Sequence, residues 1–227
     1  MDYFPRNHGN PIVKEPSLFW ATAAIVLVVC GSPAWADEII WSPRSGHGMA
    51  SFNDMLVVVG GFSFETGFFL NDVWTSDNGL DWTRTAPTSP HFTPRQQHGV
   101  VVFQDQLWVL GGQSGADLLH DVWRSSDGES WTQVVEAASW APRRGMACIA
   151  HGDYLYLTGG ETEEREYLND VWRTSDGEHW EIVVGAAAWS PRGMHALASF
   201  KDVLWLLGGA SDYELHRDVW RLSLIHI

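Results

Sequence analysis

One pattern recurs along the chain at an almost constant interval, and this interval constrains the fold more than any other feature. The pattern begins Asp-Val-Trp, passes through a polar turn and ends at a second Trp. It occupies residues 72–82, 121–131 and 170–180, and a shortened fourth copy begins at Asp218. Its first Trp stands at positions 74, 123, 172 and 220. A period near 50 residues predicts stacked units that share one continuous core.

Each repeat unit begins with an aromatic residue, a small residue, Pro and Arg, as in Trp41-Ser42-Pro43-Arg44. Two short apolar segments follow, the second of which ends in a Gly pair, and then come a loop that differs in every copy and the Asp-Val-Trp pattern. Segments rich in branched and aromatic residues predict strands. We therefore expect an all-β protein made of four-stranded antiparallel β-propeller blades. About four units are present, spanning roughly 41–91, 92–139, 140–188 and 189–221.

The Gly pair, the variable loop and the Trp after Asp-Val resemble kelch repeats of the galactose-oxidase/kelch-like superfamily over residues 41–220. Because kelch propellers usually close with six or seven blades, the resemblance implies that residues 37–227 form an incomplete ring. The tail 222–227 departs from the repeat. The turn Thr75-x-Asp77-x-Gly79-x-x-Trp82 also resembles the Asp-box hairpin of sialidases, but the later copies lack one residue of that spacing.

The periodic Trp and Gly residues are interpreted as structural. A large aromatic side chain buries about 150–250 Å², so the Trp side chains are expected to pack between blades. The paired glycines predict a positive φ or the close approach of a neighbouring strand. The expected core set is Trp74, Trp82, Trp123, Trp131, Trp172, Trp180, Trp220, Gly60, Gly61, Gly111, Gly112, Gly159, Gly160, Gly208 and Gly209. The aromatics before Pro-Arg (Trp41, Phe92, Trp140 and Trp189) are expected to pack as well, or else to form a stacking platform on one rim.

A periodic Arg and a periodic Asp carry opposite charges at fixed positions. The arginines are Arg44, Arg95, Arg143 and Arg192, and the aspartates are Asp72, Asp121, Asp170 and Asp218. We expect each Arg to be satisfied by an Asp or by loop carbonyls. If the arginines instead point freely into a central channel, they form an anion site, so they also count as candidate binding residues.

The variable loops supply the other candidate binding residues, because binding sites commonly lie on loops that a rigid scaffold positions. These candidates are Phe64, Glu65, Asp117, Glu163, Arg165 and Tyr213. Glu163 and Arg165 belong to a charged loop that also contains Glu161, Glu164 and Glu166. This loop is interpreted as a solvated surface, or alternatively as a site for a cationic partner or a metal ion.

Neither a catalytic set nor a cofactor is predicted. His47, His98 and His195 occupy one repeat position, but equivalent residues lie on different blades and are too far apart to share an ion at the ~2.1 Å His–metal distance. Copper oxidases with a kelch-type propeller contain a Cys joined to a Tyr. Here Cys148 with Tyr154 or Tyr156 is the only pair that resembles that arrangement. No second motif supports it.

The N-terminus is interpreted as a processing segment. Arg6 and Lys14 precede an apolar run over 18–30, and Ala34-Trp35-Ala36 forms a small-residue cleavage site. We therefore expect residues 1–36 to be a signal peptide and the protein to be exported to the periplasm, the cell surface or the medium. The alternatives are an uncleaved anchor and a lipoprotein. No transmembrane span is expected after removal of the signal.

The chain carries a net charge of −14 without a basic cluster, which excludes nucleic acid as an expected partner. The leading hypothesis is an exported kelch-type scaffold that binds a protein or a glycan through its variable loops. The rival is a carbohydrate-active enzyme that resembles the sialic-acid epimerase or sialidase propellers. The third possibility is a purely structural surface repeat. Fold alone does not decide among them.

Overall fold

The computed structural model describes residues 41–86, 90–212 and 214–222. The expected signal peptide, the candidate residue Tyr213 and the tail residues 223–227 lie outside this part of the chain. Every regular element within it is a β-strand. No helix among these residues has the length and apolar character needed to cross a membrane.

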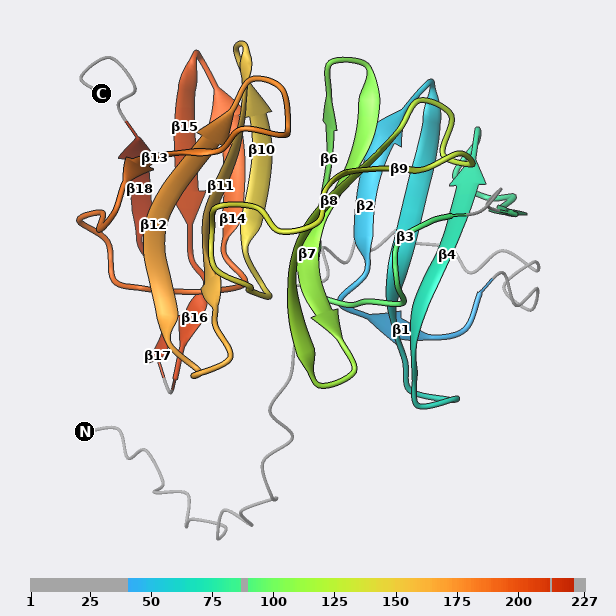
Figure 1. Ribbon diagram of the computed structural model, residues 1–227, viewed down its shortest axis with the longest axis horizontal. Helices are drawn as coiled ribbons and strands as arrows, with labels where there is room; N and C mark the ends of the chain where they lie inside the picture. Colours follow the sequence, from blue (N-terminus) through green and yellow to red (C-terminus); the bar gives the residue numbers. More distant parts are fainter. Residues whose placement is uncertain (1–40, 87–89, 213, 223–227) are drawn as a thin grey trace, which may run out of the picture. The chain divides into compact units, whose positions relative to one another are not determined.

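The strands form four successive antiparallel blades and one separate two-stranded sheet (Figure 1). The first blade contains β1 (Arg44–Ser45), β2 (Gly48–Phe52), β3 (Met55–Ser63), β4 (Phe68–Ser76) and β5 (Thr83–Thr85). The second contains β6 (Gly99–Phe103), β7 (Gln106–Ser114), β8 (Asp117–Ser125) and β9 (Thr132–Val135). The third contains β10 (Ala147–His151), β11 (Tyr154–Glu161), β12 (Tyr167–Thr174) and β13 (Glu181–Val184). The fourth contains β14 (Ala196–Phe200), β15 (Val203–Leu207) and β18 (Val219–Leu222), with a separate hairpin of β16 (Ala210–Ser211) and β17 (Glu214–Leu215).

This arrangement confirms the predicted propeller blades. Neighbouring strands within each blade follow chain order, except that the short β1 pairs with β3. The first long strands of successive blades lie against each other, β2 with β6, β6 with β10 and β10 with β14. The expectation that the blades belong to an incomplete ring stays a prediction.

Tight turns join the first two long strands of each blade, as the short Asn-Asp and Gln-Asp sequences predict. Asn53 and Asp54 have φ values of 51° and 60°, and Gln104 and Asp105 have 50° and 53°. Two consecutive residues in the left-handed region are the geometry of a two-residue hairpin turn whose twist matches its strands. The predicted hairpins are therefore confirmed.

The variable loops contain more regular structure than the sequence analysis expects. Each of β3, β7 and β11 continues beyond its Gly pair, and each following strand begins well before Asp-Val-Trp. The register shifts at the Gly pair, for example between Thr158 and Gly160, and pairing then resumes between Glu161 and Tyr167. The extra residue is accommodated as a bulge, so most of each loop is a strand extension with a short exposed tip.

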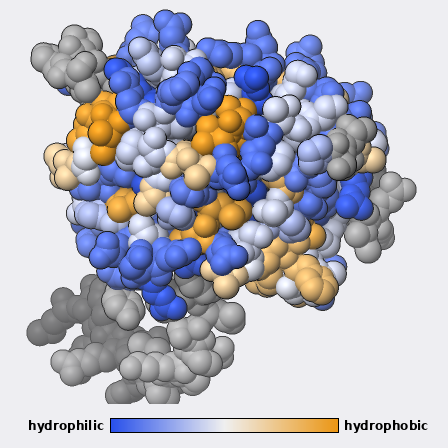
Figure 2. Space-filling view, in the orientation of Figure 1, coloured by the Kyte–Doolittle hydropathy of each residue, from blue (hydrophilic) through white to orange (hydrophobic). Residues whose placement is uncertain are grey.

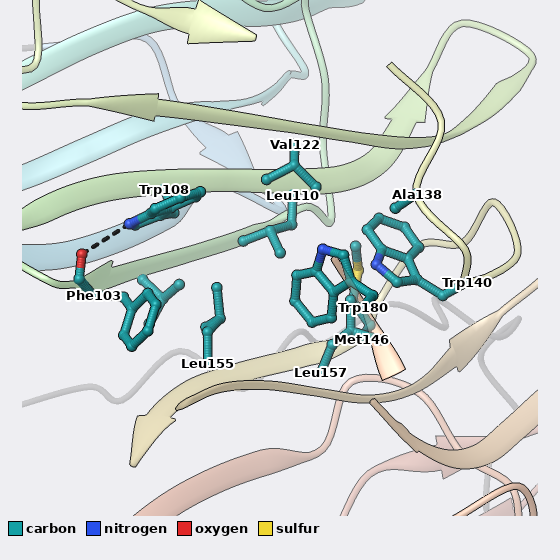
Figure 3. Close-up of a cluster of buried hydrophobic side chains, with 11 residues drawn as sticks. Phe103, Trp108, Leu110, Val122, Ala138, Trp140, Met146, Leu155, Leu157 and Trp180 are labelled. Atoms are coloured by element: carbon teal, nitrogen blue, oxygen red, sulfur yellow. Dashed lines mark hydrogen bonds between the residues drawn. The ribbon is translucent and has the colours of Figure 1, made fainter. Parts of the chain in front are cut away.

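The hydrophobic core lies between successive blades rather than within one blade. One buried cluster joins the first and second blades, a second joins the second and third, and a third joins the third and fourth. Figure 3 shows the middle cluster, in which Leu110 and Trp108 of the second blade face Leu155, Leu157 and Trp180 of the third. Trp123, Trp172 and Trp220 each pack in or against the cluster shared with the preceding blade, which confirms the predicted inter-blade packing.

The second Trp of each complete repeat packs edge-on against the aromatic that precedes Pro-Arg in the same blade. The ring centroids are 4.5 Å apart for Trp41 and Trp82, and 4.9 Å apart for Phe92 and Trp131. Edge-to-face geometry is a favourable arrangement of aromatic rings. Phe92, Trp140 and Trp189 are buried, so these three aromatics pack in the core as expected and offer no stacking platform, whereas Trp41 is half-buried.

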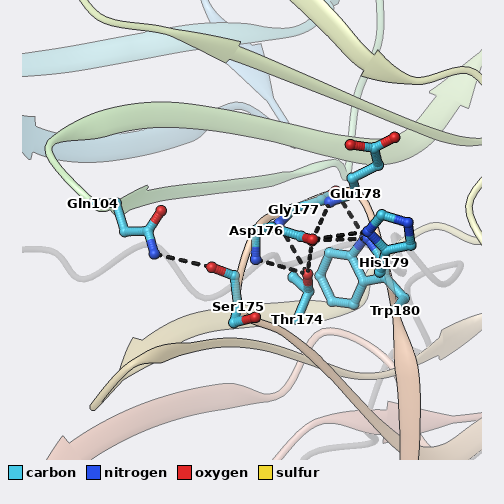
Figure 4. A network of polar contacts seen from close by, with 8 residues as sticks. All are labelled: Gln104, Thr174, Ser175, Asp176, Gly177, Glu178, His179 and Trp180. Carbon is cyan, nitrogen blue, oxygen red and sulfur yellow. Dashed lines mark hydrogen bonds and ion pairs between the residues drawn. The ribbon is translucent and has the colours of Figure 1, made fainter.

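In the Asp-box-like turn of the first blade, the hydrogen bonds to the backbone are made by Ser76 and Asn78 and not, as the resemblance implies, by Thr75 and Asp77. In the first blade Ser76 Oγ accepts the Gly79 N–H at 2.8 Å, and Asn78 Oδ1 accepts the Leu80 N–H at 2.8 Å. Thr174 and Asp176 make the same bonds in the third blade (Figure 4). The three turns therefore share one register, in which a hydroxyl residue and an Asp or Asn two positions later hold the backbone.

Each turn of this kind in the second and third blades also contacts the preceding blade. The Asn53 side chain donates to the Ser126 carbonyl at 3.3 Å, and the Gln104 side chain donates to the Ser175 carbonyl at 2.9 Å (Figure 4). Each bond joins the turn between the first two long strands of one blade to the Asp-box-like turn of the next blade. These turns lie at the end of the blades opposite the variable hairpins.

Candidate functional site

The repeated Arg and the repeated Asp of each blade form a hydrogen-bonded ion pair, here called the clamp, of which Arg95 with Asp121 is one example. The guanidinium of Arg95 binds the two carboxylate oxygens of Asp121 at 2.7 and 2.8 Å and donates to the Gly111 carbonyl at 2.9 Å. Its Nε donates to the Thr93 carbonyl at 3.0 Å. The indole N–H of Trp123 donates to Asp121 at 2.7 Å. The Arg95 side chain has no solvent exposure, so its charge is neutralised inside the protein.

The same clamp occurs in every blade. Its other charge pairs are Arg44–Asp72, Arg143–Asp170 and Arg192–Asp218, and the other indole donors are Trp74, Trp172 and Trp220. Burial raises the pKa of Asp72, but the hydrogen bonds from Arg44 and Trp74 outweigh it and lower that pKa overall. The hydrogen bond from Arg192 lowers the pKa of Asp218. The predicted Arg–Asp pairing is confirmed, and an anion could reach these guanidinium groups only by displacing a carboxylate.

The Gly pairs join each blade to the next. The second glycine donates its N–H to the carbonyl of the next repeated Arg, from Gly61 to Arg95 at 2.8 Å, from Gly112 to Arg143 at 3.0 Å and from Gly160 to Arg192 at 2.9 Å. The first glycine faces a side chain of the next blade. A Cβ at Gly60 would lie 3.1 Å from His98, and one at Gly111 would lie 2.6 Å from Met146. Both predicted reasons for the glycines, positive φ and close approach, therefore hold at Gly60, which has a φ of 58°.

Two of the three repeated histidines, His98 and His195, are buried in separate blade interfaces, whereas His47 is exposed. Burial, followed by the charge of Arg95, lowers the pKa of His98 to about 3, and burial with Arg192 lowers that of His195 to about 4. His195 Nε2 lies 2.7 Å from the Thr158 hydroxyl. Both imidazoles are therefore neutral at pH 7. No group of side chains suited to a metal ion occurs among residues 41–86, 90–212 and 214–222.

Cys148 and the two tyrosines lie on opposite faces of the third blade. Cys148 packs in the cluster shared with the second blade, whereas Tyr154 and Tyr156 pack in the cluster shared with the fourth. Side chains alternate between the faces of a strand, which explains the separation. Burial raises the pKa of the Cys148 thiol to about 12. Cys148 therefore does not form the Cys–Tyr pair of such a copper centre with either tyrosine.

A row of left-handed residues crosses the blades beside the variable hairpins. Gln97 donates its N–H to the Gly46 carbonyl at 2.7 Å, Gly145 donates to Gln97 at 2.9 Å, and Met194 donates to Gly145 at 2.7 Å. All four residues have a positive φ, from 52° at Gln97 to 65° at Gly145. Each stands two positions after a repeated Arg, a spacing that could have revealed the row. The row lies beside the β3–β4, β7–β8, β11–β12 and β16–β17 hairpins, which lie at one end of the blades (Figure 1), here called the loop face.

A polar network lies on the loop face between the second and third blades. Arg144 donates to both carboxylate oxygens of Glu161 at 3.0 and 3.1 Å and to Gln113 Oε1 at 2.8 Å. The Gln96 amide donates to the same Gln113 oxygen at 3.1 Å. Burial, and then the charges of Glu161 and Asp212, raise the pKa of the neighbouring Tyr167. The network fixes the hairpins of these two blades relative to each other.

An aromatic cluster covers the β3–β4 hairpin of the first blade. The Phe62 ring lies edge-on to Phe64 at 5.4 Å and to Phe69 at 5.3 Å. Phe64 and Phe68 are each 69% exposed, more than the other phenylalanines of the described residues. Phe68 pairs with Ser63, so its side chain lies on the opposite face of the hairpin from Phe62 and Phe69. Figure 2 shows the corresponding pale orange area at the lower right, over the tip of this hairpin.

The tips of the hairpins carry exposed acidic side chains. These residues are Glu65, Asp117, Glu163, Glu164, Glu166, Asp212 and Glu214, against the exposed basic residues Arg165 and Arg217. Figure 2 shows hydrophilic residues over the lower ends of the third and fourth blades, at the lower left. Among the described hairpin tips, acidic residues therefore outnumber basic ones.

The candidate binding residues separate into two groups. Phe64, Glu65, Asp117, Glu163 and Arg165 are exposed on the loop face, and their role as binding residues stays a prediction. The four repeated arginines lie in the clamps beneath that face. Sequence reasoning missed Phe68, Gln113, Arg144 and Tyr167, although all four lie within or directly beside segments that vary between repeats.

Comparison with known proteins agrees with this architecture. Residues 32–209 match the family model described as the KLHDC2/KLHL20/DRC7 Kelch-repeats domain. The chain therefore belongs to the kelch-repeat propellers. A segment of 89 residues is 32% identical to the tRNA wybutosine-synthesizing protein 2/3/4 of Oryza sativa subsp. japonica. That match covers 39% of this chain and 8% of the rice protein, so the chain spans less than a tenth of that relative's length.

Proposed function

We propose that this protein is an exported scaffold that binds a polypeptide through its loop face, without catalysis. Kelch-repeat domains generally bind proteins, which supports the class of partner. One observation carries the proposal: exposed Phe64 and Phe68 project from a hairpin whose base is bonded to the next blade. Exposed apolar patches at such positions mark interaction sites, and rigid support limits the entropy lost on binding.

The clamps supply that support. Arg95 donates its backbone N–H to the Leu70 carbonyl of the preceding blade at 2.8 Å, while its side chain holds Asp121. One residue therefore connects the base of the β3–β4 hairpin with the buried charges of the second blade. The tips can vary in sequence because these bonds are made by backbone atoms and by residues below the loop face.

The binding proposal is tested by presenting the immobilised chain to a peptide-display library and, in parallel, to a glycan array. The wild-type protein is compared with a variant in which Phe64, Glu65 and Phe68 are replaced by Ser. We expect peptides to be enriched on the wild type and lost on the variant, at unchanged thermal stability. Glycan binding that depends on the same residues would replace the polypeptide with a sugar ligand. Absence of any binding that depends on the loop face would refute the scaffold function.

Export is a separate part of the proposal, supported by the apolar run over 18–30 and the Ala34-Trp35-Ala36 sequence. Expression of the chain in a bacterium, followed by fractionation and N-terminal sequencing, tests it. We expect the protein outside the cytoplasm with Asp37 as its first residue. A cytoplasmic protein that keeps residues 1–36 would contradict export.

A further inference from the structure

The loop face combines exposed aromatic rings with an excess of negative charge. Phe64 and Phe68 are 69% exposed, and the exposed carboxylate residue Glu65 stands between them in sequence. Asp117 lies at the tip of the next hairpin. The faces of aromatic rings attract cations, and carboxylates add a longer-range attraction of the same sign.

Three arginines on or beneath the loop face are already paired with carboxylates. Arg44 and Arg95 are held in their clamps by Asp72 and Asp121, and Arg144 binds Glu161 on the loop face. By contrast, the hairpin tips carry exposed carboxylates for which the described residues supply few basic neighbours, since Arg165 and Arg217 are the exposed basic residues there. The exposed charge at the described hairpin tips is therefore predominantly negative.

The structure thus defines the chemistry of a partner. We propose that the loop face binds a cationic polypeptide segment that contains large apolar side chains. These side chains contact the exposed rings of Phe64 and Phe68, which lie on the two faces of the β3–β4 hairpin tip, and the Lys or Arg residues lie toward Glu65, Asp117 and the acidic tips. This inference rests on the proposed function. An exposed apolar patch supplies most of the contact energy, whereas complementary charge selects the partner and accelerates its association.

The experiment characterises the peptides that the wild-type chain enriches from a 12-residue display library. We expect them to carry net positive charge together with an aromatic or large aliphatic residue. An enriched peptide is then synthesised, and its affinity is measured for the wild type, for the double variant F64S/F68S and for the double variant E65K/D117K. Each double variant should weaken binding at least 10-fold at low salt.

Two matched variants control for general changes of surface. F200S replaces a phenylalanine that is 59% exposed at the opposite end of the fourth blade, and E129K reverses an exposed charge in the Asp-box-like turn of the second. Neither variant should change the affinity by more than about 2-fold. A change of NaCl from 50 to 300 mM should weaken wild-type binding and leave E65K/D117K less affected, because salt screens exposed charges.

The outcomes separate this inference from the function on which it rests. Enriched peptides that are acidic or neutral, but still depend on Phe64 and Phe68, would overturn the cationic partner and leave the binding scaffold intact. Enriched peptides that bind F64S/F68S as well as the wild type but lose affinity for E65K/D117K would overturn the aromatic contact and leave the binding scaffold intact. Peptides that neither double variant weakens, or no enrichment at all, would overturn both proposals.

Discussion

Gly177 in the third blade lies directly against the indole ring of Trp108 in the second blade, closely enough that a Cβ at position 177 would collide with the ring. Trp108 has no solvent exposure, and its indole N–H donates to the Phe103 carbonyl at 2.9 Å (Figure 3). The ring therefore cannot move away without breaking a buried hydrogen bond. Because Gly177 has no side chain, the Asp-box-like turn of the third blade can pack directly on Trp108 in the core of the second blade.

A matched pair of glycines tests this contact. Gly128 holds the equivalent position one blade earlier with a φ of 79°, against 78° for Gly177, but a Cβ there would meet nothing within 4 Å. We expect G128A to cost about 1–2 kcal/mol from left-handed strain alone. G177A should cost a further ~1–3 kcal/mol from overpacking. Urea unfolding measures both, and equal losses of stability would show that the Trp108 contact is unimportant.

The buried clamp predicts strong coupling between Arg95 and Asp121. R95M should destabilise the protein by about 3–5 kcal/mol, because it leaves a buried carboxylate without its counter-ion. R95M/D121L should cost clearly less than the sum of the two single variants. The exposed pair Arg173–Glu181, with side chains 25% and 60% exposed, is the control, and R173M should cost less than about 1 kcal/mol. Additive losses at Arg95 and Asp121 in urea unfolding would contradict the clamp.

The buried histidines predict that stability falls in weak acid. Because the folded-state pKa values of His98 and His195 lie at about 3 and 4, below the ordinary 6.5, the unfolded chain binds more protons as the pH drops below 6.5. Between pH 7 and 5 each histidine should therefore lower the free energy of unfolding by at most about 2 kcal/mol. H98M/H195M, which introduces the residue that the third repeat has at Met146, should flatten this dependence. A wild type equally stable at pH 7 and 5 would show that the histidines are accessible to protons.

The aromatic rings of the loop face should contribute little to stability. F64A removes a side chain that is 69% exposed, and we expect a change within about 0.5 kcal/mol. F92A removes a fully buried ring that packs on Trp131, and it should cost about 3–5 kcal/mol. Thermal unfolding of the two variants compares them directly. A large loss for F64A would mean that this ring serves the fold rather than an exposed surface.

Much of the architecture could be predicted from sequence, because equivalent side chains make equivalent packing contacts in each blade. The interval between Trp74, Trp123 and Trp172 predicts stacked units, and the structure places Trp123 and Trp172 at blade interfaces. The sequence predicted that Arg95 is satisfied by an Asp such as Asp121 or by loop carbonyls, because opposite charges that recur at the same interval can pair in every repeat. The hairpin turns followed from local backbone preference.

Other features could not be predicted because they depend on contacts between blades or on how a strand is pleated. The positive φ of Gln97 and Met194 belongs to a hydrogen-bonded row that no single repeat contains. The register of the Asp-box-like turn depends on which hydroxyl, Thr75 or Ser76, faces the backbone, and the strand pleat decides this. Arg144, Glu161 and Gln113 form one network although they come from two repeats.

The sequence by itself determined that the chain forms kelch-type blades, since a regular spacing of large aromatics, glycine pairs and opposite charges has few compact solutions. Only the tertiary structure decided which of those residues remain accessible. It buried the side chains of the four repeated arginines, which bind their aspartates, and left Phe64 and Phe68 exposed among carboxylates, because burial depends on how neighbouring blades pack and not on the chemistry of a residue alone.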